Sequence, residues 1–363
     1  MTKPVNDEYA RLLGTDNVRP QLFPGSNPRM LTASSDKTIR LWDLKTGEHL
    51  RTFHGHKGAV LDMKVSWEVG NWRAVTASAD GTLAHWDVEN TVWLGGMEGH
   101  AGAVSSVDVD WEPEEHERRC VSGSYDKTVK LWDLHSYECQ LTLEGHIAPV
   151  CGVSADWEGS RVLSCSSDKT LKLWDMEAGK EVLHMEGHTG PVWCCSMSAD
   201  EMMALSGSMD RHLMLWDLRS GTCIRAMLQH ARAVTSIDVD WDAMQAISTS
   251  VDRSLMLWDL EDGEPLMKLE KHPGTVSCVN VDWLGRRMIS GAGPGDVAIR
   301  LWDFSDGYCA NELTGHTGSV WALSADWASA HKAALEVKGI GIEVREDDDD
   351  EVPARGPSKT AEY

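Results

Sequence analysis

Three residue types that could form a nucleophilic triad recur together along this chain of 363 residues. His146, Ser164 and Asp168 make one such set, and equivalent sets recur at nearly regular intervals, seven in all. In a triad, the histidine takes the proton of a serine that attacks a carbonyl carbon, while the aspartate orients the histidine. An enzyme needs this arrangement once, whereas a structural network is needed in every repeating unit. The sevenfold recurrence therefore favours a structural role over catalysis.

The elements that must position these residues are marked by a repeated Trp-Asp pair. Seven pairs end short runs of alternating apolar residues, with spacings of 44, 46, 42, 42, 42 and 44 residues. A histidine keeps the same spacings; the seven are His56, His100, His146, His188, His230, His272 and His316. A fixed period in the forties predicts a β-propeller with one four-stranded blade in each repeat.

The unit from His146 to His188 shows how one blade is expected to form. Short apolar or alternating runs separated by turns predict four strands, at residues 150–155, 161–165, 170–174 and 181–185. A single blade of this kind cannot bury both of its faces. The blades must therefore stack around a ring.

The two ends of the repeat region predict how the ring closes. The first unit begins near Met30 and supplies only the last three strands of a blade, and residues 318–327 supply a first strand. Pairing of these segments would give seven four-stranded antiparallel blades with no open edge. The predicted fold class is therefore all-β, a seven-bladed propeller closed by a C-terminal strand.

The predicted propeller occupies most of the chain. It spans residues 29–327, between a short lead of residues 1–28 and an extension of residues 328–363. The extension lacks the repeat pattern and contains the acidic run of residues 346–351. We interpret this part of the chain as a disordered, solvated tail.

The composition argues against several kinds of partner. A net charge of −23 repels phosphate groups, so neither nucleic acid nor an anionic membrane surface is expected to bind. No apolar run is long enough to span a membrane, so no insertion is predicted, and residues 1–28 lack the apolar stretch of a signal peptide. The nine cysteines, without a Cys-x-x-Cys, indicate free thiols in the cytoplasm or nucleus. Because no His and Cys pair has metal-ligand spacing, neither a metal nor a cofactor is expected.

Together these motifs resemble those of the WD-repeat family, over about residues 29 to 327. Members of that family form a hydrogen-bonded tetrad of His, Ser or Thr, Asp and Trp in each blade. The resemblance assigns these roles, among others, to His146, Ser164, Asp168 and Trp174, and to His188, Ser206, Asp210 and Trp216. In the last unit Asp296 lies two residues late relative to His272, so its membership of a tetrad stays open.

In propellers of this family the partner often binds at one mouth of the central channel. The positions that the resemblance places there hold mostly small, neutral residues; the larger ones are Trp193, Trp321, Tyr125, Met209 and Leu61. Trp193 and Trp321 are not required by the repeat. Aromatic anchors in a neutral surrounding are typical of protein-binding hot spots, and packing against neighbouring blades is the alternative.

Two repeated features have competing interpretations. In six units a tryptophan lies eleven residues after the histidine, either packing between blades or forming an apolar ring on the opposite face: Trp67, Trp111, Trp157, Trp241, Trp283 and Trp327. A cation follows the turn aspartate in five units: Lys37, Lys127, Lys169, Arg211 and Arg253. These cations would suit an acidic or phosphorylated peptide, although lysine is ordinary at this position in the family.

The sequence thus predicts a non-enzymatic scaffold that holds a peptide or protein segment at the channel mouth, as a subunit of a larger complex. The alternative is a substrate-receptor subunit of a cullin–RING ubiquitin ligase. Residues 216–219, Trp-Asp-Leu-Arg, resemble the WDxR box of such receptors. That box differs from an ordinary repeat by little more than its final arginine, here Arg219.

Overall fold

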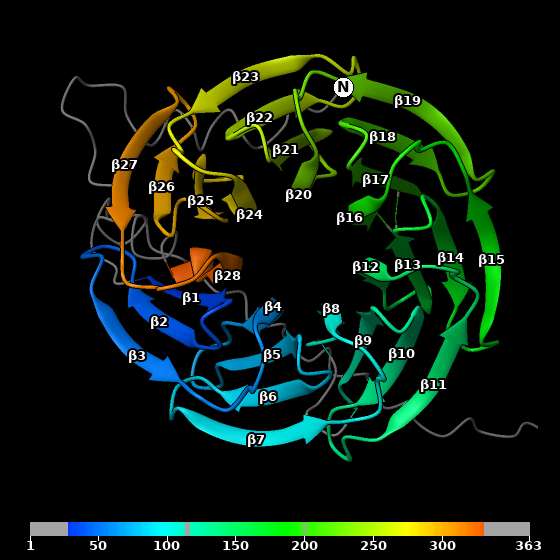
Figure 1. Cartoon of the computed structure of the whole chain (residues 1–363), viewed down its shortest axis with the longest axis horizontal. Coiled ribbons are helices and arrows are strands. Elements are labelled where there is room, and N and C mark those ends of the chain that lie inside the picture. The colour runs from blue at the N-terminus through cyan, green and yellow to red at the C-terminus, as the bar shows by residue number, and fades with distance from the viewer. Residues whose placement is uncertain (1–27, 113–116, 199, 201, 330–363) are drawn as a thin grey trace, which may run out of the picture.

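Seven four-stranded antiparallel sheets form a closed ring around a central channel (Figure 1). The computed structural model describes residues 28–112, 117–198, 200 and 202–329. Within each blade the strands follow one another from the channel to the outer rim, as the sequence predicts (Figure 1). The four strands predicted between His146 and His188 agree with β12 to β15 to within one residue at every boundary.

The strands of each blade fall into four classes by their distance from the channel. The innermost strands are β4 (Val60–Ser66), β8 (Val104–Val109), β12 (Val150–Asp156), β16 (Val192–Ser198), β20 (Val234–Asp240), β24 (Val276–Asp282) and β28 (Val320–Ala325). The second strands are β1 (Arg29–Ser34), β5 (Arg73–Ser78), β9 (Arg119–Ser124), β13 (Arg161–Ser166), β17 (Met203–Ser208), β21 (Gln245–Ser250) and β25 (Arg287–Ala292). The third strands are β2 (Ile39–Asp43), β6 (Leu83–Asp87), β10 (Thr128–Asp133), β14 (Leu171–Asp175), β18 (His212–Asp217), β22 (Ser254–Asp259) and β26 (Ile299–Asp303). The outer strands are β3 (His49–Phe53), β7 (Val92–Met97), β11 (Cys139–Glu144), β15 (Lys180–Met185), β19 (Thr222–Leu228), β23 (Pro265–Glu270) and β27 (Tyr308–Leu313).

The ring closes as predicted, through a strand from the far end of the chain. Strand β28 pairs antiparallel with β1, so that Met30 faces Ala325 and Ser34 faces Val320. In Figure 1 β28, in orange, completes the blade formed by the blue strands β1, β2 and β3. In a first blade of only three strands the edge of β1 would be unpaired. Pairing with β28 gives this edge its hydrogen-bond partner.

The hydrophobic core is divided among the contacts between blades. Seven clusters of buried side chains are present, and each joins two neighbouring blades. In one of them Val121 and Val129 of the β8–β11 blade pack with Val162 and Trp174 of the next blade. Since the second and third strands are buried on both faces, no blade is stable without its neighbours.

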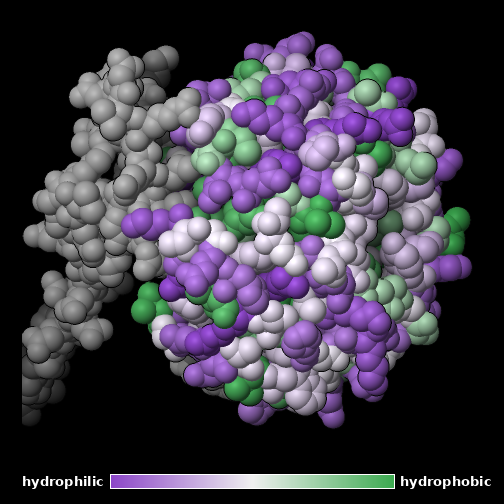
Figure 2. All heavy atoms as spheres, turned by 60° about the vertical axis from the view of Figure 1, so that its left-hand side comes forward, coloured by the Kyte–Doolittle hydropathy of each residue, from purple (hydrophilic) through white to green (hydrophobic). Residues whose placement is uncertain are grey.

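The surface on the side shown in Figure 2 is mostly hydrophilic or intermediate in hydropathy, with the hydrophobic residues in small separate groups. Among the described residues, no helix has the length and apolar character that crossing a bilayer requires. Residues 1–27 and 330–363 lie outside the described residues, so the predicted lead and the acidic tail at 346–351 stay predictions.

Candidate functional site

In each blade four side chains join into the hydrogen-bonded tetrad that the sequence suggests. In the β12–β15 blade the hydroxyl of Ser164 accepts a hydrogen bond from Nε1 of Trp174 at 2.8 Å. The same oxygen lies 2.8 Å from Nε2 of His146, whose Nδ1 lies 2.8 Å from Oδ2 of Asp168. The next blade repeats this geometry with Ser206, Trp216, His188 and Asp210 at 2.8 to 2.9 Å.

The aspartate of the tetrad is held by its own tight turn. Oδ1 of Asp168 accepts hydrogen bonds from the amide and the hydroxyl of Thr170, at 3.0 and 2.6 Å. Its Oδ2 also accepts the amide of Ile147, which ties the turn to the loop before β12. Burial alone would raise the pKa of Asp168, but the hydrogen bonds from His146 and Thr170 outweigh it and lower that pKa. The carboxylate therefore remains ionised and keeps the histidine oriented.

The other five blades carry the same network. Their members are His316, Thr32, Asp36 and Trp42; His56, Thr76, Asp80 and Trp86; His100, Ser122, Asp126 and Trp132; His230, Ser248, Asp252 and Trp258; and His272, Ser290, Asp296 and Trp302. The first of these sets joins residues from both ends of the chain, since His316 precedes β28 and Thr32 lies in β1.

The doubt about Asp296 is resolved by the structure. The two additional residues are absorbed in the loop between β25 and β26, and Oδ2 of Asp296 lies 3.0 Å from Nδ1 of His272. In the β12–β15 blade the hydroxyl of Thr170, two residues after Asp168, bonds that aspartate. The equivalent residue after Asp296 is Ala298, which has no hydroxyl. Nη1 of Arg300 supplies a donor to the other carboxylate oxygen, lying 2.5 Å from Oδ2 of Asp296 and 2.6 Å from Nδ1 of His272. Burial, with the positive charge of Arg300 as a smaller contribution, lowers the pKa of His272 to about 4.

The tetrads do not supply a catalytic nucleophile. The side chains of Ser164 and Ser206 are fully buried, so no substrate can reach their hydroxyls. Each hydroxyl is already engaged by an indole N–H and an imidazole nitrogen. Each tetrad instead links the second strand, the third strand and the loop before the first strand of a blade.

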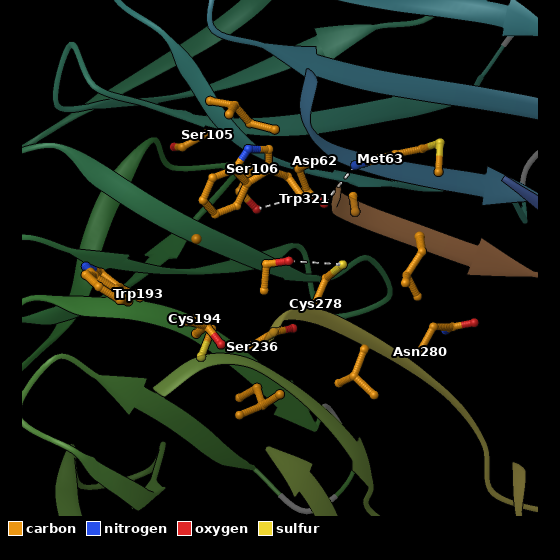
Figure 3. A pocket seen from close by; sticks show the side chains of 18 of the residues that line it. Asp62, Met63, Ser105, Ser106, Trp193, Cys194, Ser236, Cys278, Asn280 and Trp321 are labelled. Atoms are coloured by element: carbon orange, nitrogen blue, oxygen red, sulfur yellow. Dashed lines mark hydrogen bonds between the residues drawn. The ribbon is translucent and has the colours of Figure 1, made fainter. Parts of the chain in front are cut away.

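The central channel contains a cavity of about 320 Å³ (Figure 3). Three of the five residues proposed for the mouth line it: Leu61 on β4, Trp193 on β16 and Trp321 on β28. Tyr125 and Met209 do not line the cavity; they lie in the turns after β9 and β17, with 52% and 54% of their surface exposed. The predicted residues therefore divide into a channel group and two outlying turn residues.

Charged residues of the inner strands, which the repeat motifs do not indicate, also contribute to the channel. Asp62 lies six residues after the histidine of its repeat, and Lys64, Asp108 and Asp238 lie eight residues after theirs. This constant distance from the histidine is the sequence signal that could have identified them. Oδ2 of Asp62 accepts the hydroxyl of Ser106 at 2.8 Å, and Oδ2 of Asp108 accepts the amide of Ala155 at 2.8 Å. These hydrogen bonds connect the inner strands of neighbouring blades, β4 with β8 and β8 with β12.

The second repeated tryptophan packs between blades, which was one of its two interpretations. Each of the six is partly buried against one of the inter-blade clusters. Three also donate their indole N–H to a side chain of the preceding blade: Trp67 to Ser324, Trp283 to Asp238 and Trp327 to Asn280. Packing therefore accounts for these residues without a ligand.

The five cations after the turn aspartates lie exposed at the tips of those turns. Lys169, for example, adopts a φ of 75° between β13 and β14. Binding of an acidic peptide there stays a prediction. Over the described part of the chain, no three His, Cys, Asp or Glu side chains are grouped so that they could hold a metal ion. All nine cysteines are free thiols.

Seven stacked blades, each with one tetrad, define a β-propeller built from sequence repeats. A model of the family described as WD domain, G-beta repeat matches residues 18–43, 47–87, 92–133, 137–175, 179–217 and 221–259. The chain belongs to this WD-repeat family. The blade formed by β24 to β27 lies outside the matched segments, but its complete tetrad shows that it is a further repeat.

Curated relatives match only short segments of this chain. It is 41% identical over 44 residues to the guanine nucleotide-binding protein subunit beta-5b of Danio rerio, covering 12% of this chain and 11% of that protein. It is 43% identical over 60 residues to a probable E3 ubiquitin ligase complex SCF subunit sconB of Arthroderma benhamiae, covering 16% and 8%. A protein of the same description from Emericella nidulans is 48% identical over 46 residues, covering 13% and 7%. The matches thus span about a tenth or less of each relative's length, which is the extent of one or two repeats.

Proposed function

We propose that this protein is a non-enzymatic scaffold that binds a peptide or protein segment at the mouth of its central channel. Trp193, Trp321 and Leu61 form the anchor site, and Tyr125 and Met209 extend it over the neighbouring turns. The protein would act as a subunit of a larger complex in the cytoplasm or nucleus. Membership of the WD-repeat family supports a role in protein interaction, while the identity of the partner rests on the site itself.

The observation that carries this proposal is the position of Trp193 and Trp321. Neither belongs to any of the seven inter-blade clusters, which was the alternative explanation for these residues. Both line the channel cavity, and Trp321 keeps 36% of its surface exposed. Tryptophan is the residue type most enriched among hot spots, and removing such an anchor typically costs about 2 kcal/mol or more in binding.

The test is affinity capture from native lysate, comparing the wild-type protein with the Trp193→Ala/Trp321→Ala double variant. We expect partners to be lost while the melting temperature stays within about 3 °C, because neither side chain fills a core cluster. Trp93→Ala is the matched control, since Trp93 is 58% exposed on the outer strand β7. Retention of every partner by the folded double variant would refute the channel mouth as the binding site.

A second candidate function is the substrate receptor of a cullin–RING ubiquitin ligase. Arg219 is exposed in the loop after β18, and the sconB relatives are described as subunits of an SCF ubiquitin ligase complex. The matched segments are too short to transfer that role. Co-purification of a ligase adaptor that is lost in Arg219→Ala but kept in the double tryptophan variant would favour this candidate over the first.

A further inference from the structure

The channel below the mouth carries more negative than positive charge. Among the described residues, two carboxylates and one ammonium group line its cavity: Asp62 and Lys64 on β4 and Asp238 on β20, while Asp108 on β8 lies outside the lining. Nζ of Lys64 lies 3.5 Å from Oδ1 of Asp108, so these two groups pair. Two carboxylates, Asp62 and Asp238, remain without a cation at ion-pair distance among the described residues.

The hydrogen-bond partners of these two carboxylates are neutral. Asp62 accepts from the hydroxyl of Ser106 at 2.8 Å and from the amide of Val107 at 2.9 Å. Asp238 accepts from Nε1 of Trp283 and from the amide of Val281, both at 3.0 Å. Such donors stabilise a carboxylate without cancelling its charge. The negative potential of both groups, offset in part by the charge of Lys64, therefore extends into the cavity that they line.

Solvent reaches the cavity, but the two carboxylates are themselves partly buried. Lys64 lines the cavity and keeps 47% of its side chain accessible, so solvent reaches it through the channel. Burial raises the pKa of Asp62 and raises that of Asp238 to about 6, so the charged form of each carboxylate is poorly solvated. A cation that entered the channel would compensate this unfavourable charge.

The two mouth tryptophans lie on opposite sides of the cavity. Trp193 belongs to the β16–β19 blade and Trp321 to the blade that β28 completes; two blades separate them on one side of the ring and three on the other. Figure 3 shows both side chains at the cavity, with Asp62 among the residues that line it. Aromatic faces attract cations, and they also pack against the aliphatic stem of a long side chain.

We infer that the channel receives the cationic side chain of a peptide, an arginine or a lysine, with its stem between Trp193 and Trp321 and its charge beside Asp62 and Asp238. The inference rests on the proposed function, because it specifies the partner chemistry of the same mouth. The depth fits such a side chain. Asp62 and Asp238 lie one and three strand positions below the tryptophans, which is roughly 3 to 10 Å at the rise of a β-strand.

The first test compares two probes that differ in charge alone. The pentapeptide acetyl-Ala-Ala-Arg-Ala-Ala-amide and its citrulline analogue are titrated into the full chain, and the indole N–H signals of Trp193 and Trp321 are followed by NMR. Trp193→Phe and Trp321→Phe assign those two signals. We expect the arginine peptide to shift both signals and to bind at least about tenfold more tightly than the citrulline peptide, as a partly buried charge interaction should give.

The second test looks for a gain of affinity, which a misfolded variant cannot produce. Lys64→Gln removes the only cation among the described residues that line the cavity, so it should strengthen binding of the arginine peptide about tenfold and leave the citrulline peptide unchanged. Lys127→Gln is the matched control. Lys127 is exposed in a turn outside the cavity, and screening by salt should keep its effect within about twofold.

The outcomes separate this inference from the proposed function. Equal affinity for the two peptides, no shift of either indole signal up to millimolar concentration, or no gain in Lys64→Gln would overturn the cation site. If captured partners are nevertheless lost from the double tryptophan variant, the scaffold proposal stands and its ligand chemistry is different. If the arginine peptide binds but the captured partners are unaffected, the channel site holds and the proposed function at that mouth fails.

Discussion

Removing one tetrad hydroxyl should destabilise the whole ring. In Ser164→Ala the indole N–H of Trp174 and Nε2 of His146 both lose a partner that lies 2.8 Å away. Both groups lie inside the blade, and the side chain of Ser164 has no exposed surface through which water could replace it. A buried polar group left without a partner costs about 1 to 3 kcal/mol. Two such groups give an expected loss of about 4 kcal/mol, and a fall of roughly 10 °C in melting temperature.

The matched variant is Ser164→Thr, because two other blades use a threonine at this place, Thr32 and Thr76. It keeps the hydroxyl and adds one methyl group, so we expect a loss of less than about 1.5 kcal/mol. The assay is urea unfolding of both variants, followed by tryptophan fluorescence and circular dichroism. A Ser164→Ala protein as stable as Ser164→Thr would refute the view that the hydroxyl satisfies buried groups.

Three further predictions concern closure, pH and the outer edge. Deleting residues 317–363 removes β28 and should give aggregated protein by size-exclusion chromatography, whereas deleting 346–363 should not; a soluble, cooperatively folding 1–316 fragment would contradict the closure. The pKa of His272 falls from 6.5 to about 4 on folding, so the stability it contributes above pH 6.5 is lost as the pH drops from 6.5 toward 4. Melting temperatures over this window should fall more steeply for the wild type than for His272→Gln, and equal slopes would show that His272 does not titrate as argued. Strand β7 is the one outer strand without a charged residue, so its exposed edge can pair with another molecule. Trp93→Lys should therefore reduce aggregation, measured as light scattering on prolonged incubation; unchanged scattering would mean that this edge does not promote aggregation.

The fold was predictable because the repeat constrains every blade in the same way. The seven Trp-Asp pairs and histidines fixed the register, and β12 to β15 then followed from alternation within a unit. Asp296 was left open because spacing alone cannot reveal a substitute donor. The contact of Arg300 with Asp296 depends on how a lengthened loop folds back.

The candidate site was less predictable than the fold. Trp193 and Trp321 could be identified because the repeat does not require them. The different positions of Tyr125 and Met209 follow from the turns that carry them, whose amides bond Ala103 and Pro191, the residues just before the inner strands and outside the cavity lining. The charges of Asp62 and Asp238 went unnoticed because an inward-facing position on an inner strand accepts serine, cysteine or aspartate with the same backbone. Only the arrangement of seven such strands around one cavity shows that these charges share a space.

The closing strand also determines when the molecule can become complete during its synthesis. The tetrad that joins Thr32 to His316 spans 284 residues, and its blade cannot form until β28 has been made. At a synthesis rate of about 5 to 20 residues per second, the edge of β1 waits roughly 15 to 60 s for its partner. The blades between them can assemble from local contacts in that time, while the ring stays open at one seam. Newly made chains therefore carry an unpaired strand edge through most of translation, and protection by chaperones matters most during that interval.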